Sequence, residues 1–134
     1  MQRRILSILV GIALVGLLTA TGAWAGSPHF VSCRVTRSGN TLEAEGKEAG
    51  LGNEAQVHVV LSATAECINR GSKHPKAANK ESVSAEGDFP VQNGKALFSI
   101  DVTATFQPDC SPPMTVVFSD ISLTDETNGI SCTL

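Results

Sequence analysis

The chain has 134 residues, with 10 Lys and Arg side chains against 13 Asp and Glu, and a formal net charge of −3. This length is enough for one domain of ordinary size, and the slight acidic excess argues against a nucleic acid or an anionic membrane as partner. One Trp, five Phe and no Tyr are present, so the stacked aromatic platform of a typical carbohydrate-binding module is not expected.

Residues 1–25 have the pattern of a secretory signal peptide. Arg3 and Arg4 precede an uncharged apolar run at 5–20, and the segment ends in A-W-A, with small residues at the positions that signal peptidase recognises. We predict cleavage after Ala25. The alternative is an uncleaved membrane anchor, but the apolar run is shorter than the roughly 20 residues that span a bilayer.

The remainder, residues 26–134, is predicted to be a single β domain. Without Arg3 and Arg4 it has 8 basic against 13 acidic side chains, a net charge of −5. A first hairpin is predicted from two alternating segments and the turn between them: Phe30–Thr36, with Val31, Cys33 and Val35 inward, the turn Ser38-Gly39-Asn40, and Thr41–Gly46. Residues 48–54, which contain two glycines, are predicted to be a connection.

The clearest strand signal is Gln56 to Cys67. Every second residue from Val57 to Cys67 is apolar, while His58, Ser62, Thr64 and Glu66 fall on the other face. This alternation predicts a half-buried strand.

Two further strands are predicted around a turn at Asn93-Gly94, because both residues tolerate positive φ. Ser82–Val91 is the weaker of the two, with Val83, Ala85 and Phe89 inward. Lys95–Phe106 alternates from Ala96 to Phe106 and should supply much of the core.

The last third of the chain begins with a proline-rich connection, Gln107–Pro113, which is incompatible with a central strand. In Met114–Thr124 the apolar row changes phase, so we predict a β-bulge near Ser119-Asp120. A turn at Asp125–Gly129 then leads to a final strand, Ile130–Leu134, with alternate residues inward.

Seven short strands and no long amphipathic helix predict an all-β fold, a two-sheet antiparallel sandwich that is immunoglobulin-like in the broad sense. A partly open barrel is the alternative. The four cysteines all follow the signal segment, and their spacing lacks the C-x-x-C pairs of a zinc site, so we predict two disulfides and no metal. Because terminal strands of sandwiches often lie side by side, Cys33–Cys132 and Cys67–Cys110 are the preferred pairs.

Several stretches resemble segments of small exported bacterial proteins of unassigned function. They are K-E-A-G-L-G-N at 47–53, C-I-N-R-G at 67–71, H-P-K-A-A-N-K at 74–80 and T-N-G-I-S at 127–131. The resemblance implies secretion and a β fold, and it implies no activity, cofactor or catalytic residue.

Residues with catalytic chemistry are few. Beyond the signal segment there are three histidines, His29, His58 and His74, and no G-x-S-x-G elbow, so surface roles are the prediction for each. Two carboxylate pairs, Glu43 with Glu45 and Asp120 with Asp125, are the candidates for glycoside hydrolysis. Asp125, Glu126 and Asn128 carry oxygen atoms suited to calcium, although an ordinary hairpin turn is the favoured interpretation. No cofactor is predicted.

One loop departs from a uniform β domain. Half of the basic residues that follow the signal lie within 11 positions, together with a histidine: Arg70, Lys73, His74, Lys76 and Lys80. We predict a binding surface for an anionic protein or cell-surface polymer, since loops on rigid scaffolds commonly carry recognition. The alternative is a solvated loop whose lysines balance nearby glutamates.

The function predicted from sequence is that of a secreted, non-enzymatic binding or surface-interaction module outside the cytoplasm. The alternatives are a small secreted hydrolase or enzyme inhibitor, and a structural protein of the cell envelope.

Overall fold

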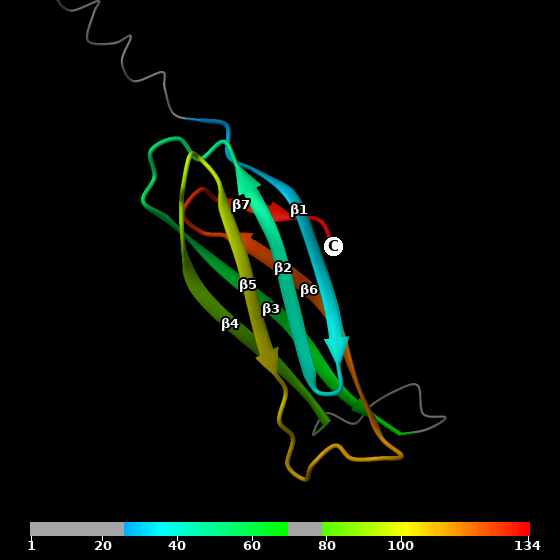
Figure 1. The fold of residues 1–134 in the computed structure, drawn as a ribbon. Helices are drawn as coiled ribbons and strands as arrows, with labels where there is room; N and C mark the ends of the chain where they lie inside the picture. Colours follow the sequence, from blue (N-terminus) through cyan, green and yellow to red (C-terminus); the bar gives the residue numbers. More distant parts are fainter. Residues whose placement is uncertain (1–25, 70–78) are drawn as a thin grey trace, which may run out of the picture.

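The computed structural model describes residues 26–69 and 79–134, which form seven β-strands and no α-helix. The strands are β1 (His29–Ser38), β2 (Thr41–Ala49), β3 (Gln56–Ile68), β4 (Lys80–Pro90), β5 (Ala96–Thr103), β6 (Thr115–Asp125) and β7 (Ile130–Cys132). They lie in two antiparallel sheets, β1-β2-β5 and β4-β3-β6-β7, which face each other as two layers (Figure 1). The predicted two-sheet sandwich is confirmed, since the described strands form two separate sheets rather than a partly open barrel.

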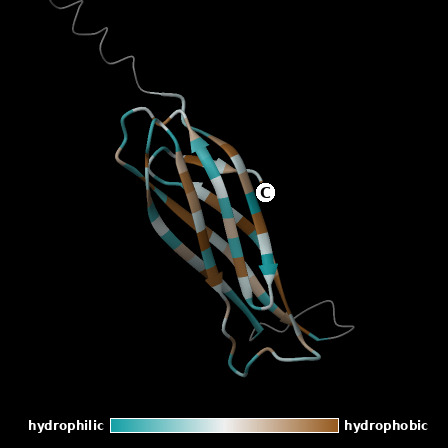
Figure 2. Cartoon of the chain, viewed as in Figure 1, coloured by the Kyte–Doolittle hydropathy of each residue, from teal (hydrophilic) through white to brown (hydrophobic). Residues whose placement is uncertain are grey.

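The core lies between the two layers and is built from alternate residues of each strand. The inward row of β3, from Val57 to Cys67, is buried throughout. The predicted row of β5 faces it, and Ala104 and Phe106 remain buried although the strand ends at Thr103. Figure 2 shows this alternation as bands of contrasting hydropathy along the strands. Period-2 patterning therefore identified most core positions correctly.

Both tight hairpins occur where the sequence predicts them. Ser38 pairs with Thr41 across Gly39 and Asn40. Asn93 and Gly94 have φ angles of 53° and 75°, and they connect the bridged residues Gln92 and Lys95. Positive φ at both central residues is typical of the turn that matches the twist of a hairpin.

A β-bulge in β6 preserves its inward row, as predicted. Ser62 of β3 pairs with Ser122 and Thr64 pairs with Ser119, so β6 has one extra residue between these pairs. Asp120, in the extra stretch, has a φ of 50°. The bulge returns the following apolar residues of β6 to the core side.

A second bulge, in β1, was not predicted, and it makes one core assignment wrong. The register shifts between Phe30, opposite Glu48, and Ser32, opposite Lys47. Phe30 therefore packs against the core, while Val31 is 54% exposed. The end of the chain also differs from expectation, because β7 stops at Cys132 and Leu134 is 49% exposed.

Both predicted disulfides are present. Cys33 of β1 is bonded to Cys132 of β7, with Cα atoms 6.6 Å apart. Cys67, near the end of β3, is bonded to Cys110 in the proline-containing connection, with Cα atoms 5.8 Å apart. The first bond links the two sheets. The second holds the connection between β5 and β6 against the end of β3.

The two lateral sides of the sandwich are built differently. On the closed side, β4 and β5 are joined by the tight hairpin, and the rings of Phe89 and Phe98 lie 6.2 Å apart, edge to face. On the open side, β1 faces β6, and β7 pairs only with the last residues of β6, from Leu123 to Asp125. Along the N-terminal part of β6, Thr115–Ile121, the edge on the open side is paired with no described strand.

Candidate functional site

A groove lies on the open side, and the residues that line it belong to both sheets. It has a volume of about 740 Å³. The residues that line it come from β1, β2, the end of β3, β6 and the C-terminal end, and most of them are apolar: Val35, Leu42, Ile68, Val116, Val117, Phe118, Ile121 and Leu134. Val117 and Leu134, at 40% and 49%, are among the most exposed large apolar side chains of the described residues. A concave apolar surface of this size is typical of a ligand-binding site.

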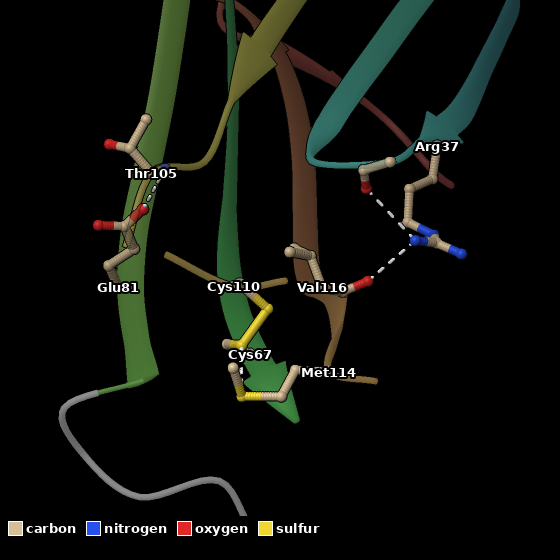
Figure 3. The surroundings of a disulfide bond; sticks show 8 residues. Arg37, Cys67, Glu81, Thr105, Cys110, Met114 and Val116 are labelled. Carbon is tan, nitrogen blue, oxygen red and sulfur yellow. Dashed lines mark hydrogen bonds between the residues drawn. A yellow bond between two sulfur atoms is a disulfide. The ribbon is translucent and has the colours of Figure 1, made fainter. Parts of the chain in front are cut away.

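The charged residues of the groove wall are both basic. Arg34 forms an ion pair with Glu45 of the neighbouring strand β2. Arg37 has no carboxylate partner among the described residues, and its Nη1 donates hydrogen bonds to the carbonyl oxygens of Val116, at 3.0 Å, and Gly39, at 3.3 Å. Figure 3 shows the Arg37 side chain extending from the end of β1 to the edge of β6. The groove therefore combines an apolar wall with a cation that no acidic side chain of the described chain neutralises.

A second polar cluster lies where β2 ends and the turn after β6 begins. Glu48 and Asp125 are both 0% exposed. Asp125 accepts hydrogen bonds from the backbone N–H groups of Thr127 and Asn128, and Asn128 Nδ2 donates to Asp125 Oδ2 at 2.7 Å and to Glu54 Oε1 at 3.1 Å. Asp125 thus stabilises the turn that carries the chain into β7.

Glu48 is the member of this cluster without a partner, since neither of its carboxylate oxygens makes a hydrogen bond with the described residues. Burial, followed by the closeness and negative charge of the Asp125 carboxylate and the charge of Glu54, raises the pKa of Glu48 to about 8. A protonated Glu48 is a donor and can bond to Asp125, whereas two ionised carboxylates in a dry site repel each other. With a pKa of about 8, Glu48 is mostly protonated at neutral pH.

His58 lies on the outer face of β3 among three carboxylates. Its Nδ1 is 2.8 Å from Asp88 Oδ1, and its Nε2 is 3.7 Å from Glu86 and 3.8 Å from Glu126. The hydrogen bond to Asp88, followed by the charges of these neighbours, raises the pKa of His58 above its usual value. The predicted outward orientation is correct, and the sequence alone did not indicate this set of partners.

The other candidates for catalysis are not assembled into a site. His29 is exposed, with its Nδ1 at 2.8 Å from the carbonyl oxygen of Ser27. Glu45 is engaged by Arg34, its cross-strand neighbour. Asp120 is exposed in the bulge, whereas Asp125 is buried opposite Val59, so the two carboxylates do not form a pair across one cleft.

The predicted basic loop falls mostly outside the described residues, which contain neither Arg70, Lys73, His74 nor Lys76. Lys80 opens β4, and its Nζ lies 3.6 Å from Glu66 Oε1 on β3. For Lys80, this ion pair agrees with the alternative interpretation, a solvated loop whose lysines balance nearby glutamates. The anion-binding loop stays a prediction.

Sequence reasoning missed both the groove and Glu48. The groove depends on which strand edges remain unpaired, which alternation does not encode. Glu48 had a signal, because it continues the inward parity of Leu42, Ala44 and Gly46 along β2. Treating 48–54 as a connection concealed this row, and β2 in fact extends to Ala49.

Within residues 26–69 and 79–134, no three His, Cys, Asp or Glu side chains are arranged to hold a metal ion. In the same part of the chain, no helix is long and apolar enough to cross a membrane.

The chain matches no protein-family model, no curated protein and no solved structure.

Proposed function

We propose that this chain is an exported, non-enzymatic binding module whose ligand occupies the groove on the open side. The observation that carries the proposal is the groove itself, an apolar concavity of about 740 Å³ with an arginine that lacks a carboxylate partner. A monomeric protein rarely leaves apolar side chains in contact with water along a concave surface unless something binds there.

Export is supported by the two disulfides, which are consistent with a protein outside the cytoplasm because thiols are kept reduced inside it. The signal pattern at residues 1–25 and the resemblance to small exported bacterial proteins support the same proposal. The immunoglobulin-like comparison has only broad architectural support, from two packed antiparallel sheets.

The enzyme alternative has weaker support. Nucleophilic catalysis needs a hydroxyl or thiol beside a base, and the described cysteines are all disulfide-bonded. The ring nitrogens of His58 contact carboxylates instead of a nucleophile. Among the described residues that line the groove, no side chain carries a carboxylate that could act as a general acid or base.

The test uses the oxidised domain, residues 26–134, as bait for culture supernatant and cell-envelope extract. A groove variant carries Val117→Asp and Leu134→Asp, two changes at exposed positions that should leave the core intact. The matched control carries Leu97→Asp, at a 71% exposed position on β5. The proposal predicts that a ligand retained by the original domain and by the control is lost by the groove variant.

Equal retention by all three proteins would contradict the groove as the binding surface. Turnover of a substrate in a broad hydrolase panel, lost in the groove variant, would replace the proposal with the enzyme alternative.

A further inference from the structure

The backbone of β6 shows what kind of ligand the groove suits. The unpaired edge of a strand presents backbone N–H and C=O groups that can pair with a further strand. One edge of β6 is paired with β3 along its whole length, from Thr115 to Asp125. On the other edge, β7 provides partners only for Leu123, Thr124 and Asp125.

The hydrogen bond from Arg37 shows which way the backbone groups of β6 point in Thr115–Ile121. Because the carbonyl oxygen of Val116 accepts from Arg37 of β1, this carbonyl is directed away from β3 and toward the open side. In an antiparallel ladder the N–H and C=O of one residue point to the same side, and the direction alternates along the strand. Phe118, two residues further, therefore presents its N–H and C=O to the open side as well.

Arg37 occupies a position that a neighbouring strand would fill. It satisfies one edge acceptor with a side-chain donor, and it does so from an exposed position at the end of β1 (Figure 3). A charge at a sheet edge also discourages pairing with arbitrary strands. A ligand that displaces Arg37 from the Val116 carbonyl must offer a backbone N–H in exchange, and a carboxylate on that ligand would give the guanidinium a new partner.

We propose that the groove binds an extended segment of a partner protein, which adds to the free edge of β6 at Thr115–Ile121 as an antiparallel strand continuing the line of β7. The segment spans roughly seven residues, or about 20 Å. Its alternate side chains are apolar and enter the groove against Val35, Val116 and Phe118, and one acidic side chain pairs with Arg37. The inference rests on the proposed function, because it names the ligand class of the same groove.

Three observations favour this occupant. A strand edge that no described strand pairs with suits an extended chain, and the apolar wall suits alternating apolar side chains. The unneutralised Arg37 calls for a carboxylate. The strand β7 already occupies the upper part of the same edge, so the added strand extends an arrangement that the fold uses. A second copy of this chain is the competing occupant.

The experiment selects binders for the oxidised domain from a displayed library of random linear seven-residue peptides, with counterselection against the Val117→Asp, Leu134→Asp variant. We expect enriched peptides to alternate apolar residues and to carry an acidic residue. Binding should weaken by about tenfold or more in Arg37→Glu, as loss of a charge-assisted contact requires. Lys95→Glu, which makes the same charge change on the closed side, should bind as the original domain does.

Backbone chemistry gives the sharpest readout. Two synthetic versions of a selected peptide carry N-methyl groups on alternate residues, in opposite phases. Strand addition predicts that one phase, in which the N–H groups facing β6 are blocked, abolishes binding, and that the other phase is tolerated. Circular dichroism and thermal melting of each variant confirm that the domain remains folded.

Failure to select any peptide would overturn the inference, as would equal tolerance of both methylation phases or unchanged binding by Arg37→Glu. A dimer of the free domain that dissociates in the Val117→Asp, Leu134→Asp variant would assign the edge to a second copy instead. If ligand capture in the preceding test still depends on the groove, the proposed function survives and only the ligand class is wrong.

Discussion

The closed and open sides of this sandwich differ in how the edges of the two sheets are joined over the core. Each side is a pair of strand edges, one from each sheet, with an apolar core behind it. On the closed side a tight hairpin and the contact between Phe89 and Phe98 seal the layers. On the open side the link is one disulfide and a three-residue strand, and a groove remains below them. We therefore expect substitutions in the core of the closed side to cost the most stability, and we propose recognition for the open side.

The largest expected loss of stability comes from a substitution on the closed side. Phe98 is 4% exposed and its ring contacts Phe89 of β4 and Phe30 of β1. Phe98→Ala should lower the free energy of unfolding by about 3 to 5 kcal/mol, because it removes apolar burial and leaves a cavity. Urea unfolding measures the change.

The matched change on the open side is Val117→Ala, for which we expect less than about 0.5 kcal/mol. Similar losses at both positions would contradict the division between the two sides.

The second prediction concerns the covalent link across the open side. Cys33 and Cys132 enclose a sequence separation of 99 residues. Replacing both with Ser should lower stability by about 2 to 4 kcal/mol, chiefly because the unfolded chain gains freedom. Thermal unfolding under non-reducing conditions gives the loss, and a melting temperature equal to that of the original domain would show that the bond contributes nothing.

The third prediction concerns pH and the buried pair at the end of β2. Glu48 ionises near its ordinary pKa in the unfolded chain but only at about 8 in the folded one. Between these values the folded state holds a proton that the unfolded state has lost, so the contribution of Glu48 to stability is largest at low pH and falls as pH rises to about 8. His58, with its raised pKa, acts in the same direction as pH rises through its folded pKa.

Glu48→Gln removes this titration and supplies a neutral donor to Asp125. We expect the variant to gain on the order of 2 to 3 kcal/mol relative to the original domain at pH 9, and less at pH 5. Glu43→Gln makes the same change at an exposed position of β2 and is the control. Parallel pH profiles for the original domain and Glu48→Gln would exclude Glu48 as the titrating group.

The smallest expected loss of stability comes from a substitution on the open side. Arg37→Ala removes one hydrogen bond from an exposed side chain to the edge of β6. The loss of stability should stay below about 1 kcal/mol, whereas the effect on ligand binding should be large. A loss comparable to that of Phe98→Ala would make Arg37 a structural residue instead of a recognition residue.

The parts of the fold that follow from local chemistry were predictable from the sequence. Alternation placed the inward residues of β3 and β5, the pair Asn93-Gly94 identified a hairpin, and the phase change in β6 predicted its bulge. Val31 was placed wrongly because a bulge in β1 left no break in the apolar pattern. Neither the unpaired edge of β6 nor the position of Arg37 beside it is a local property, since each depends on which distant strands pair.

The most direct test of the account measures amide hydrogen exchange along β6 in the free, oxidised domain. The account predicts an alternation in protection: the amides of Val117 and Ser119, directed toward β3, exchange slowly, whereas those of Val116 and Phe118, directed toward the open side, exchange fast. On adding a selected peptide, the second pair should become protected. Uniform slow exchange from Thr115 to Phe118 in the free domain would show that the edge is already covered, and it would contradict the claim that this edge receives a ligand strand.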